Sequence, residues 1–251
     1  MFDNLGLFAR TILDGILLTI EATVGGILIA TVLSFVFGLA ILSRSRTVRV
    51  VARIYIEIWR GTSEVVQLFW IYFVLPVLVG YQIVPLVAGI VVLGLNFGAY
   101  GAEIVRGSVQ SVPKAQYEGC VALSLTPAQR MRRVILPQAL VEMVPPFNNL
   151  FIQLLKGSAL LTMITVHEMT YQAREVLVDQ FISQAWLIWL VVLVFYLVLS
   201  LLITTGMKWL ERRAGRIVGR GPSRAARLRA LQVGAAAGAG LGAGLGSGGS
   251  P

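Results

Sequence analysis

The sequence predicts an all-α, polytopic membrane protein with five transmembrane helices. Hydrophobic residues make up 57 % of its 251 residues and charged residues only 13 %, whereas about a quarter of the residues in a soluble domain are charged. Five mostly apolar stretches approach the roughly 20 residues that a spanning helix needs. Basic residues gather in alternate connections between these stretches, which is the pattern of loops that face the cytoplasm.

The five apolar stretches differ in length and polarity. The first is too long for a signal-peptide core and follows no basic cluster, so we expect an uncleaved helix. The second is short, and we expect the amphipathic segment 48–59 to extend it. The fourth is less apolar than the others, whereas the fifth begins and ends at tryptophans suited to the membrane interfaces. In chain order, the stretches are residues 16–42, 65–79, 83–104, about 144–166 and 186–209.

Loop charge orients the chain. If the C-terminus is cytoplasmic, 18 of the 21 Lys and Arg residues lie on the cytoplasmic side, so we expect the N-terminus outside. Only Arg10 and Arg174 then face outward, and Lys156 lies within the fourth helix. Membrane topology therefore accounts for the net charge of +9, and we expect membrane lipid as a partner and no nucleic acid.

The cytoplasmic connection 106–140 is long and has a pattern of its own. Pro113 can begin a helix that continues through residues 116–123. Small residues spaced i, i+4 and i+7 lie on one face of that helix, and such a face lets another surface approach closely. These residues are Ala115, Gly119 and Ala122.

A second short helix is expected after the break at residues 124–126. Thr126 can cap it, with Pro127 at the first helical position and Gln129 at the third, which is a capping-box arrangement. Pro137 is expected to end or kink this helix before the fourth span. The connection is therefore either a compact docking unit of two helices or a surface loop with a solvated run of charge.

Residues 112–140 resemble the EAA loop in permease subunits of binding-protein-dependent ABC importers, most closely those of the polar amino-acid branch. That branch has roughly SVPKGQ-EAA-xLGLS-xQ-xR-V-LPQA, and this chain has SVPKAQ, EGC, ALSLT and LPQA in the same order. The stretch EIWRGTSEVVQL at 57–68 is similar to the family's EFFRGTPLLVQL. Further similar stretches lie at 99–107, 145–161 and 167–173, and the resemblance covers about residues 10–210.

The resemblance implies a type I ABC importer permease fold in the bacterial inner membrane. Such a subunit pairs with a second permease subunit, of the same or another kind, and works with an ATP-binding subunit and an external solute-binding protein. Its EAA loop docks on the ATP-binding subunit. That contact is expected at Gln116, Glu118, Gly119, Cys120, Ala122, Leu123, Ser124 and Leu125.

Two departures from the family pattern bear on geometry and on the solute. Ser124 stands where the family has Gly, and a turn that needs a positive φ suits Ser less well. Gly157 stands where the family commonly has Asp, so the obvious counter-charge for a basic solute is absent and Lys156 favours a carboxylate. The variant KGSAL is most similar to the permeases of ectoine and hydroxyectoine importers, and polar amino acids such as glutamate or glutamine stay open.

Polar residues within the apolar spans mark the candidate solute pathway or gate, because polar groups are costly in lipid. The alternative is that their amides join helices within the bundle. Glu103 and Arg106 are spaced i, i+3, and a structural ion pair between them is as well supported as a functional role. The candidate pathway residues are Asn96, Tyr100, Asn148, Asn149, Gln153 and Lys156.

Several chemistries are not expected on this chain. A single cysteine, Cys120, and a single histidine, His167, offer no disulfide, metal site or catalytic constellation. No GxxxxGK[ST] motif is present, so the chain is not expected to be an enzyme or to hold a cofactor, and ATP hydrolysis is expected on a separate subunit. The rival reading is an ATP-independent channel or ion-coupled carrier, which would show an ionisable relay or inverted repeats.

The sequence divides into two parts. Residues 1–213 form the permease domain, with a core at about 15–210, and residues 214–251 form a cytoplasmic tail that is basic at first and then rich in Ala and Gly. The basic part, residues 216–229, is suited to contact with anionic lipid, and residues 235–251 have almost no apolar surface to bury, so we expect them to be disordered. The outer segment 167–184 carries His167, Glu168, Arg174, Glu175 and Asp179, and is either a docking surface for the binding protein or an amphipathic linker.

Overall fold

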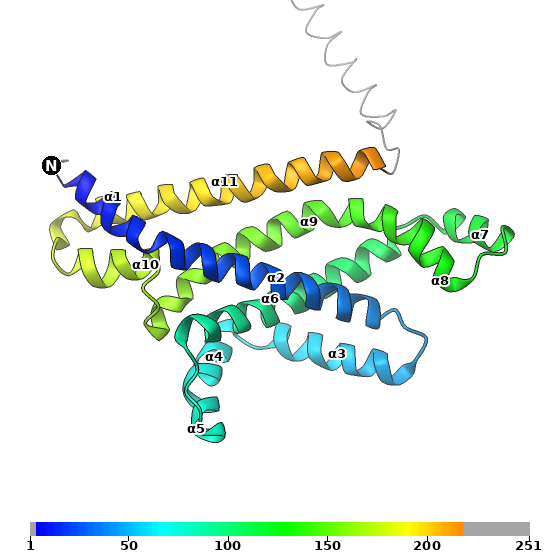
Figure 1. Cartoon of the computed structure of the whole chain (residues 1–251), viewed down its shortest axis with the longest axis horizontal. Helices are drawn as coiled ribbons and strands as arrows, with labels where there is room; N and C mark the ends of the chain where they lie inside the picture. The colour runs from blue at the N-terminus through cyan, green and yellow to red at the C-terminus, as the bar shows by residue number, and fades with distance from the viewer. Residues whose placement is uncertain (1–3, 218–251) are drawn as a thin grey trace, which may run out of the picture. The chain divides into compact units, whose positions relative to one another are not determined.

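A computed structural model describes residues 4–217 of the chain, and every regular element in that range is helical (Figure 1). Short π-helical segments lie at Trp70–Val74, Met131–Ile135 and Gln172–Val178, and 3-10 segments at Ser158–Ile164 and Ile182–Gln184. The α-helices are α1 (Leu5–Asp14), α2 (Ile16–Ala40), α3 (Arg46–Gly61), α4 (Glu64–Phe69), α5 (Leu75–Val79), α6 (Pro85–Gln110), α7 (Lys114–Ala122), α8 (Pro127–Arg130), α9 (Leu136–Gly157), α10 (Met169–Tyr171) and α11 (Ala185–Ile217).

The centre of the fold is the close packing of α2 against α6, which run side by side (Figure 1). Every fourth residue of α2 is small and buried, in the series Ala22, Gly26, Ala30, Ser34 and Gly38. Three glycines of α6 contact α2 beside or on this stripe, with Gly94 against Ile29, Gly98 against Leu33 and Gly101 against Ser34, so the two backbones approach closely. Because lipid offers no hydrophobic drive for helix association, such small-residue contacts are what holds transmembrane helices together.

Gly101 shows how tight this contact is. A Cβ atom at Gly101 would overlap the Ser34 hydroxyl of α2 and would also lie 2.8 Å from the Ser34 Cβ. The same hydroxyl donates a hydrogen bond to the Ala30 carbonyl in its own helix, and the Gly98 carbonyl lies 3.3 Å away on α6. The α2–α6 contact therefore has no room for a side chain at this position.

The segment between α2 and α6 is bent. Helix α3 and the run of α4 to α5 meet at an angle of 102°, because Thr62 and Ser63 have extended backbone angles. Residues 48–59 were expected to extend the second predicted span, residues 65–79. This expectation is wrong, because the bend separates the two segments. Within residues 4–217, three helices are long and apolar enough to cross a membrane, and the number rises to five if each of the two bent pairs is one span.

The fourth predicted span begins earlier than the sequence suggested. Helix α9 starts at Leu136, not near residue 144, and Pro137 lies in its first turn and does not end it. The π-helical segment Met131–Ile135 precedes this proline, so the chain continues from α8 into α9. Pro145 and Pro146 lie inside α9, and a 58° bend separates the end of this long segment from Met169–Val178.

Helix α11 extends past the predicted end of the permease domain at residue 213 and continues to Ile217, the last residue that the structure describes. Its exposed residues are mostly large and apolar, among them Leu193, Leu197 and Leu201, as expected for a helix that faces lipid. Residues 214–217 of the predicted tail are therefore helical, and the rest of the predicted tail, from residue 218 onward, lies outside the residues that the structure describes.

Candidate functional site

A cavity of about 550 Å³ lies where three parts of the fold meet. The break between α3 and α4 forms one wall, α6 forms the second, and the end of α9 with the 3-10 segment that follows it forms the third. Four of the six predicted pathway residues line it, whereas Asn148 and Asn149 do not. The lining residues are Thr62, Ser63, Glu64, Asn96, Phe97, Tyr100, Gln153, Lys156, Gly157 and Leu160.

Asn96 holds the α3–α4 break against α6. It is 3 % exposed, and its Nδ2 donates to the Trp59 carbonyl at 3.0 Å and to Gln67 Oε1 at 2.9 Å. Gln67 Nε2 in turn donates to the Trp59 carbonyl at 2.9 Å and to Thr62 Oγ1 at 2.6 Å. These bonds satisfy backbone groups that the break leaves without helical partners, so Asn96 shapes the pocket wall and its amide nitrogen is already used.

Lys156 and Gln153 are exposed together with Asn149, and the three share one face of α9 because they are spaced i, i+4 and i+7. Lys156 and Gln153 line the cavity, while Asn149 lies one turn further from it. Asn148 behaves differently, because its Oδ1 is buried and has no hydrogen-bond partner in the described chain. Among the residues that line this pocket, Lys156 is the only one with a cationic side chain.

Glu64 also lines the pocket, although it was not among the predicted pathway residues. The signal was present, because EIWRGTSEVVQL has an acid where the similar family stretch has Leu. The expectation that the pocket lacks a counter-charge for a cationic group is therefore wrong, because Glu64 supplies a carboxylate although Gly157 does not. One acidic and one basic group therefore face the same cavity.

The predicted docking helix is α7. The small-residue face at Ala115, Gly119 and Ala122 is exposed, and a Cβ at Gly119 would meet nothing within 4 Å. Leu123, just beyond the helix, is 75 % exposed. Gln116, Glu118 and Ser124 are also exposed, and Leu125 is half-buried.

Cys120 is the exception among the predicted contact residues. Its side chain is 3 % exposed, so it packs inside this chain and gives no surface to a partner. Tyr117 supports the same inward face, because its hydroxyl donates to the Val109 carbonyl of α6 at 3.0 Å. Gln138 of α9 donates to Gln116 Oε1 at 3.3 Å. Helix α7 is therefore bonded to both α6 and α9.

The turn after α7 has the hydrogen bonds of a Schellman motif. The Leu125 amide donates to the Cys120 carbonyl and the Ser124 amide to the Val121 carbonyl, while Ser124 has a φ of 53°. The left-handed backbone that the family's Gly would favour is thus present with Ser. The predicted capping box at Thr126 and Gln129 is confirmed.

Replacing Ser124 by Gly is expected to stabilise this turn by about 0.5–1 kcal/mol, because the left-handed conformation costs a non-Gly residue about 1–2 kcal/mol and part of that is offset by the entropy of Gly. Amide hydrogens of α7 should then exchange about two- to fivefold more slowly. Ser111→Gly is the matched control, because Ser111 has a φ of −74° and should gain nothing. Equal slowing in both variants would contradict the prediction.

Glu168, in contrast, is buried and is not part of an exposed docking surface. It is 0 % exposed and caps α10, accepting hydrogen bonds from Thr162 Oγ1 at 2.6 Å, the Tyr171 amide at 2.9 Å and the Tyr196 hydroxyl at 3.1 Å. The other charged residues of segment 167–184 are exposed.

Glu103 and Arg106 form the predicted ion pair, with Arg106 Nη2 2.7 Å from Glu103 Oε2.

The model of the family "binding-protein-dependent transport system inner membrane component" matches residues 10–216. The chain belongs to this family. This inner membrane component is 39 % identical over 219 residues to the probable amino-acid ABC transporter permease protein y4tF of Sinorhizobium fredii, with 85 % of this chain and 90 % of that protein covered. It is 37 % identical over 203 residues to the glutamine transport system permease protein GlnP of Escherichia coli, covering 80 % and 92 %.

Solved structures agree with this assignment. The inner membrane component superposes with a TM-score of 0.77 and 30 % identity on a chain from a crystal structure of an amino acid ABC transporter with histidines, covering 85 % of this chain and 98 % of that one. A chain of the MetNI methionine ABC transporter in an inward-facing conformation gives a TM-score of 0.67 at 21 % identity, with 82 % and 96 % covered. The latter likeness shows the shared fold.

Proposed function

We propose that this chain is the permease subunit of an ATP-driven importer that carries a small zwitterionic solute across the membrane. Family membership supports the transport role, and the relatives described above are permease subunits of amino-acid and glutamine transporters. The observation that carries the solute class is the pocket with Lys156 on one wall and Glu64 on another. The family assignment does not favour the ATP-independent channel or carrier.

The two charges of the pocket suit the two charges of a zwitterion. Lys156 offers a positive charge to a carboxylate, and Glu64 offers a negative charge to an ammonium or amidinium group. Ionisable groups at this depth are costly unless they meet a partner of opposite charge or water. Polar amino acids such as glutamine fit this description, and so do ectoine and hydroxyectoine, to whose permeases the KGSAL stretch is similar.

Uptake by cells that carry the whole system tests the solute class. Uptake of labelled glutamine and of labelled ectoine is measured separately, each with unlabelled ectoine, glutamine, glutamate or arginine as competitor. We expect at least one of the two labelled zwitterions to be taken up, and unlabelled ectoine or glutamine to compete with it. Lys156→Gln should lower uptake about tenfold, because a hydrogen bond to a charged group is worth about 1.5–3 kcal/mol and about 1.4 kcal/mol corresponds to a factor of ten. Lys208→Gln, an exposed lysine on α11, is the control. Competition by arginine alone, with both zwitterions inert, contradicts the proposal.

The exposed face of α7 supports a proposal for how this chain assembles with other subunits. We propose that a second permease subunit, of the same or another kind, pairs with this chain, that an ATP-binding subunit docks on α7 and that a solute-binding protein delivers solute from outside. Because α7 is bonded to α6 and α9, and both line the pocket, movement of α7 would shift two pocket walls. Access would then alternate between the two sides of the membrane, with ATP hydrolysis on the partner and no cofactor here.

The proposed topology has five spans, with the N-terminus outside and the C-terminus in the cytoplasm. A reporter enzyme that works only in the cytoplasm is expected to be active when fused after Arg213 and silent when fused at Gly80, which lies between α5 and α6. The positive-inside bias supplies the reason. The opposite pattern of activity would show the topology to be inverted, and activity at both positions would reduce the number of spans.

A further inference from the structure

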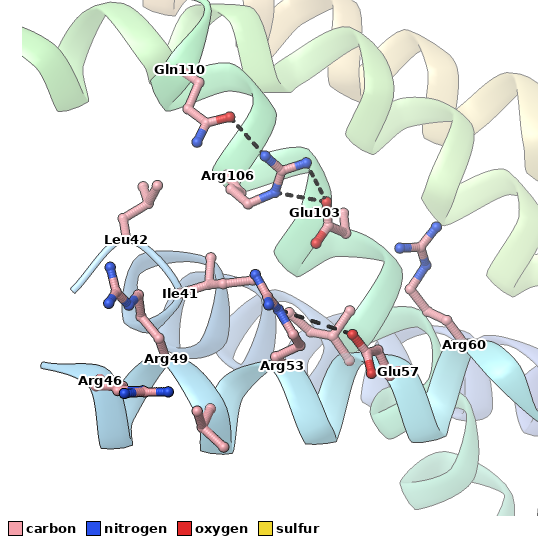
Figure 2. Close-up of a pocket in the computed structure, with 12 residues that line it drawn as sticks. Ile41, Leu42, Arg46, Arg49, Arg53, Glu57, Arg60, Glu103, Arg106 and Gln110 are labelled. Carbon is pink, nitrogen blue, oxygen red and sulfur yellow. Dashed lines mark hydrogen bonds and ion pairs between the residues drawn. The ribbon is translucent and has the colours of Figure 1, made fainter. Parts of the chain in front are cut away.

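A second, larger cavity lies between α3 and α6 and is strongly basic. Its volume is about 750 Å³, and Figure 2 shows Arg49, Arg53 and Arg60 rising from α3 toward the Glu103–Arg106 pair of α6. Five arginines and two glutamates line it. The charged residues are Arg46, Arg49, Arg53, Glu57, Arg60, Glu103 and Arg106.

The arginines of α3 that line this cavity are exposed and form a basic face on one side of the helix. Arg46, Arg53 and Arg60 repeat every seven residues and so share one side of the helix, while the opposite side exposes the apolar residues Val51 and Ile58. From Arg46 to Arg60 the face is about 21 Å long, at 1.5 Å for each of 14 residues.

The end of this helix reaches the middle of a membrane span. The Tyr55 hydroxyl donates to the Leu95 carbonyl of α6 at 2.7 Å, and α6 is a candidate span from Pro85 to Gln110. Arg60 lies at that end of α3, and an arginine at that depth is not stable against lipid and faces a water-filled space or a partner charge. The cavity between α3 and α6 supplies that space.

The charges in this cavity are not balanced. Arg106 is satisfied by Glu103 and by Gln110 Oε1 at 2.7 Å, and Arg53 lies 4.0 Å from Glu57. In the part of the chain that the structure describes, neither Arg46 nor Arg49 forms an ion pair with an acid. The cavity therefore presents at least two uncompensated guanidinium groups, each with several N–H donors suited to a carboxylate.

The basic cavity adjoins the solute pocket. The Arg60 guanidinium, which lines the basic cavity, lies 5.1 Å from the ring centroid of Tyr100, which lines the solute pocket. The polar residues of α6 continue along one helix face through both spaces. In order they are Asn96, Tyr100, Glu103, Arg106 and Gln110.

We propose that the arginine-lined cavity is a second subsite on the cytoplasmic side of the solute path, and that it binds the carboxylate of the solute after the solute passes the Arg60–Tyr100 contact. This inference rests on the proposed function. The chemistry that the cavity recognises is an anionic oxygen group, which a solute carboxylate, inorganic phosphate or an anionic lipid headgroup could each supply. The experiment must therefore separate these sources.

Charged thiol reagents test the cavity directly, because Cys120 is the sole cysteine of the chain and is buried. Val50 lines the cavity and is exposed, whereas Val51 faces the opposite side of α3. The complete transporter with Val50→Cys is placed in phosphatidylcholine nanodiscs, which hold no anionic lipid, and labelling is followed on this chain. The sulfonate-bearing methanethiosulfonate should react about tenfold faster than the trimethylammonium reagent, as expected for a focused positive potential.

Matched variants assign this preference to the cavity. Arg46→Gln with Arg49→Gln should remove the preference, while Arg44→Gln, a neighbouring arginine that does not line the cavity, should preserve it. Val51→Cys should show no comparable preference. Equal rates for the two reagents at Val50→Cys, or loss of the preference in Arg44→Gln as well, would overturn the subsite.

Protection separates the possible ligands. Labelling of Val50→Cys is repeated with ectoine, L-glutamine or inorganic phosphate present, and the zwitterion that the wild-type system takes up should slow the sulfonate reagent at concentrations where phosphate does not. Protection by phosphate alone, or by none of the three, overturns the assignment of the ligand. If neither zwitterion is taken up at all, the proposed function fails, whereas transport without anion preference at Val50→Cys refutes only the subsite.

Discussion

Replacing Gly119 by Arg is expected to abolish binding of the ATP-binding subunit while the chain remains in the membrane. Gly119 lies at the centre of the exposed small-residue face of α7, and a Cβ there meets nothing within this chain, so the substitution should leave the fold intact. A long charged side chain would hold the partner surface away from α7 and would have to be desolvated at its centre, where charged residues are depleted in interfaces.

Co-purification with a tagged ATP-binding subunit measures this effect, and we expect at least a tenfold loss, as for the central positions of other interfaces. Gly6→Arg is the matched control, because Gly6 on α1 also has open space around its Cα but lies far from α7 along the bundle (Figure 1). Normal recovery of the ATP-binding subunit with Gly119→Arg would refute the assignment of α7 as the docking surface.

Replacing Gly101 by Ile is expected to remove most of the folded protein. A side chain at this position would overlap Ser34 and press on Leu150 of α9, whose Cδ2 would be 3.3 Å from the new Cβ. Overpacking a tight core costs about 1–3 kcal/mol or more, and the small-residue contact between α2 and α6 is the main source of helix association here. Helices α2 and α6 would have to separate to admit the side chain.

The yield of monodisperse protein after detergent extraction measures this effect, and we expect a fall of about tenfold, in line with a cost above 1.4 kcal/mol. Gly206→Ile on α11 is the control, because a Cβ there meets nothing within 4 Å and a larger apolar residue suits an exposed position in lipid. A normal yield for Gly101→Ile would mean that α2 and α6 are not packed as described.

Sequence patterns predicted the helices well where the interactions that form them lie between residues close together in the chain. The apolar stretches located α2, α6 and α11, and the short motif at Thr126–Gln129 located a cap that is present with both of its hydrogen bonds. Ser124 was singled out because the family has Gly there, and its φ is positive. In each case, the decisive interactions lie within a few residues of one another in the chain.

Features that depend on distant contacts could not be predicted in this way. The bend at Thr62 and Ser63 is held by Asn96, about 30 residues further along the chain. The burial of Glu168 depends on Tyr196 and Thr162. Cys120 was assigned to the docking surface by its place in the EAA pattern, which does not tell which side of α7 faces inward.

The unbroken course of α6 and the interrupted course of α9 give the two pocket walls different mechanical stiffness. Helix α6 runs from Pro85 to Gln110 without an interior proline or π-helical segment, so a displacement applied at the end next to α7 is transmitted over its length of about 39 Å. The α8–α9 segment contains a π-helical segment and the prolines Pro145 and Pro146, where helices bend most readily. A single force from α7 would therefore translate one wall and flex the other, and the distance between Tyr100 and Lys156 would change without any hinge at the pocket itself.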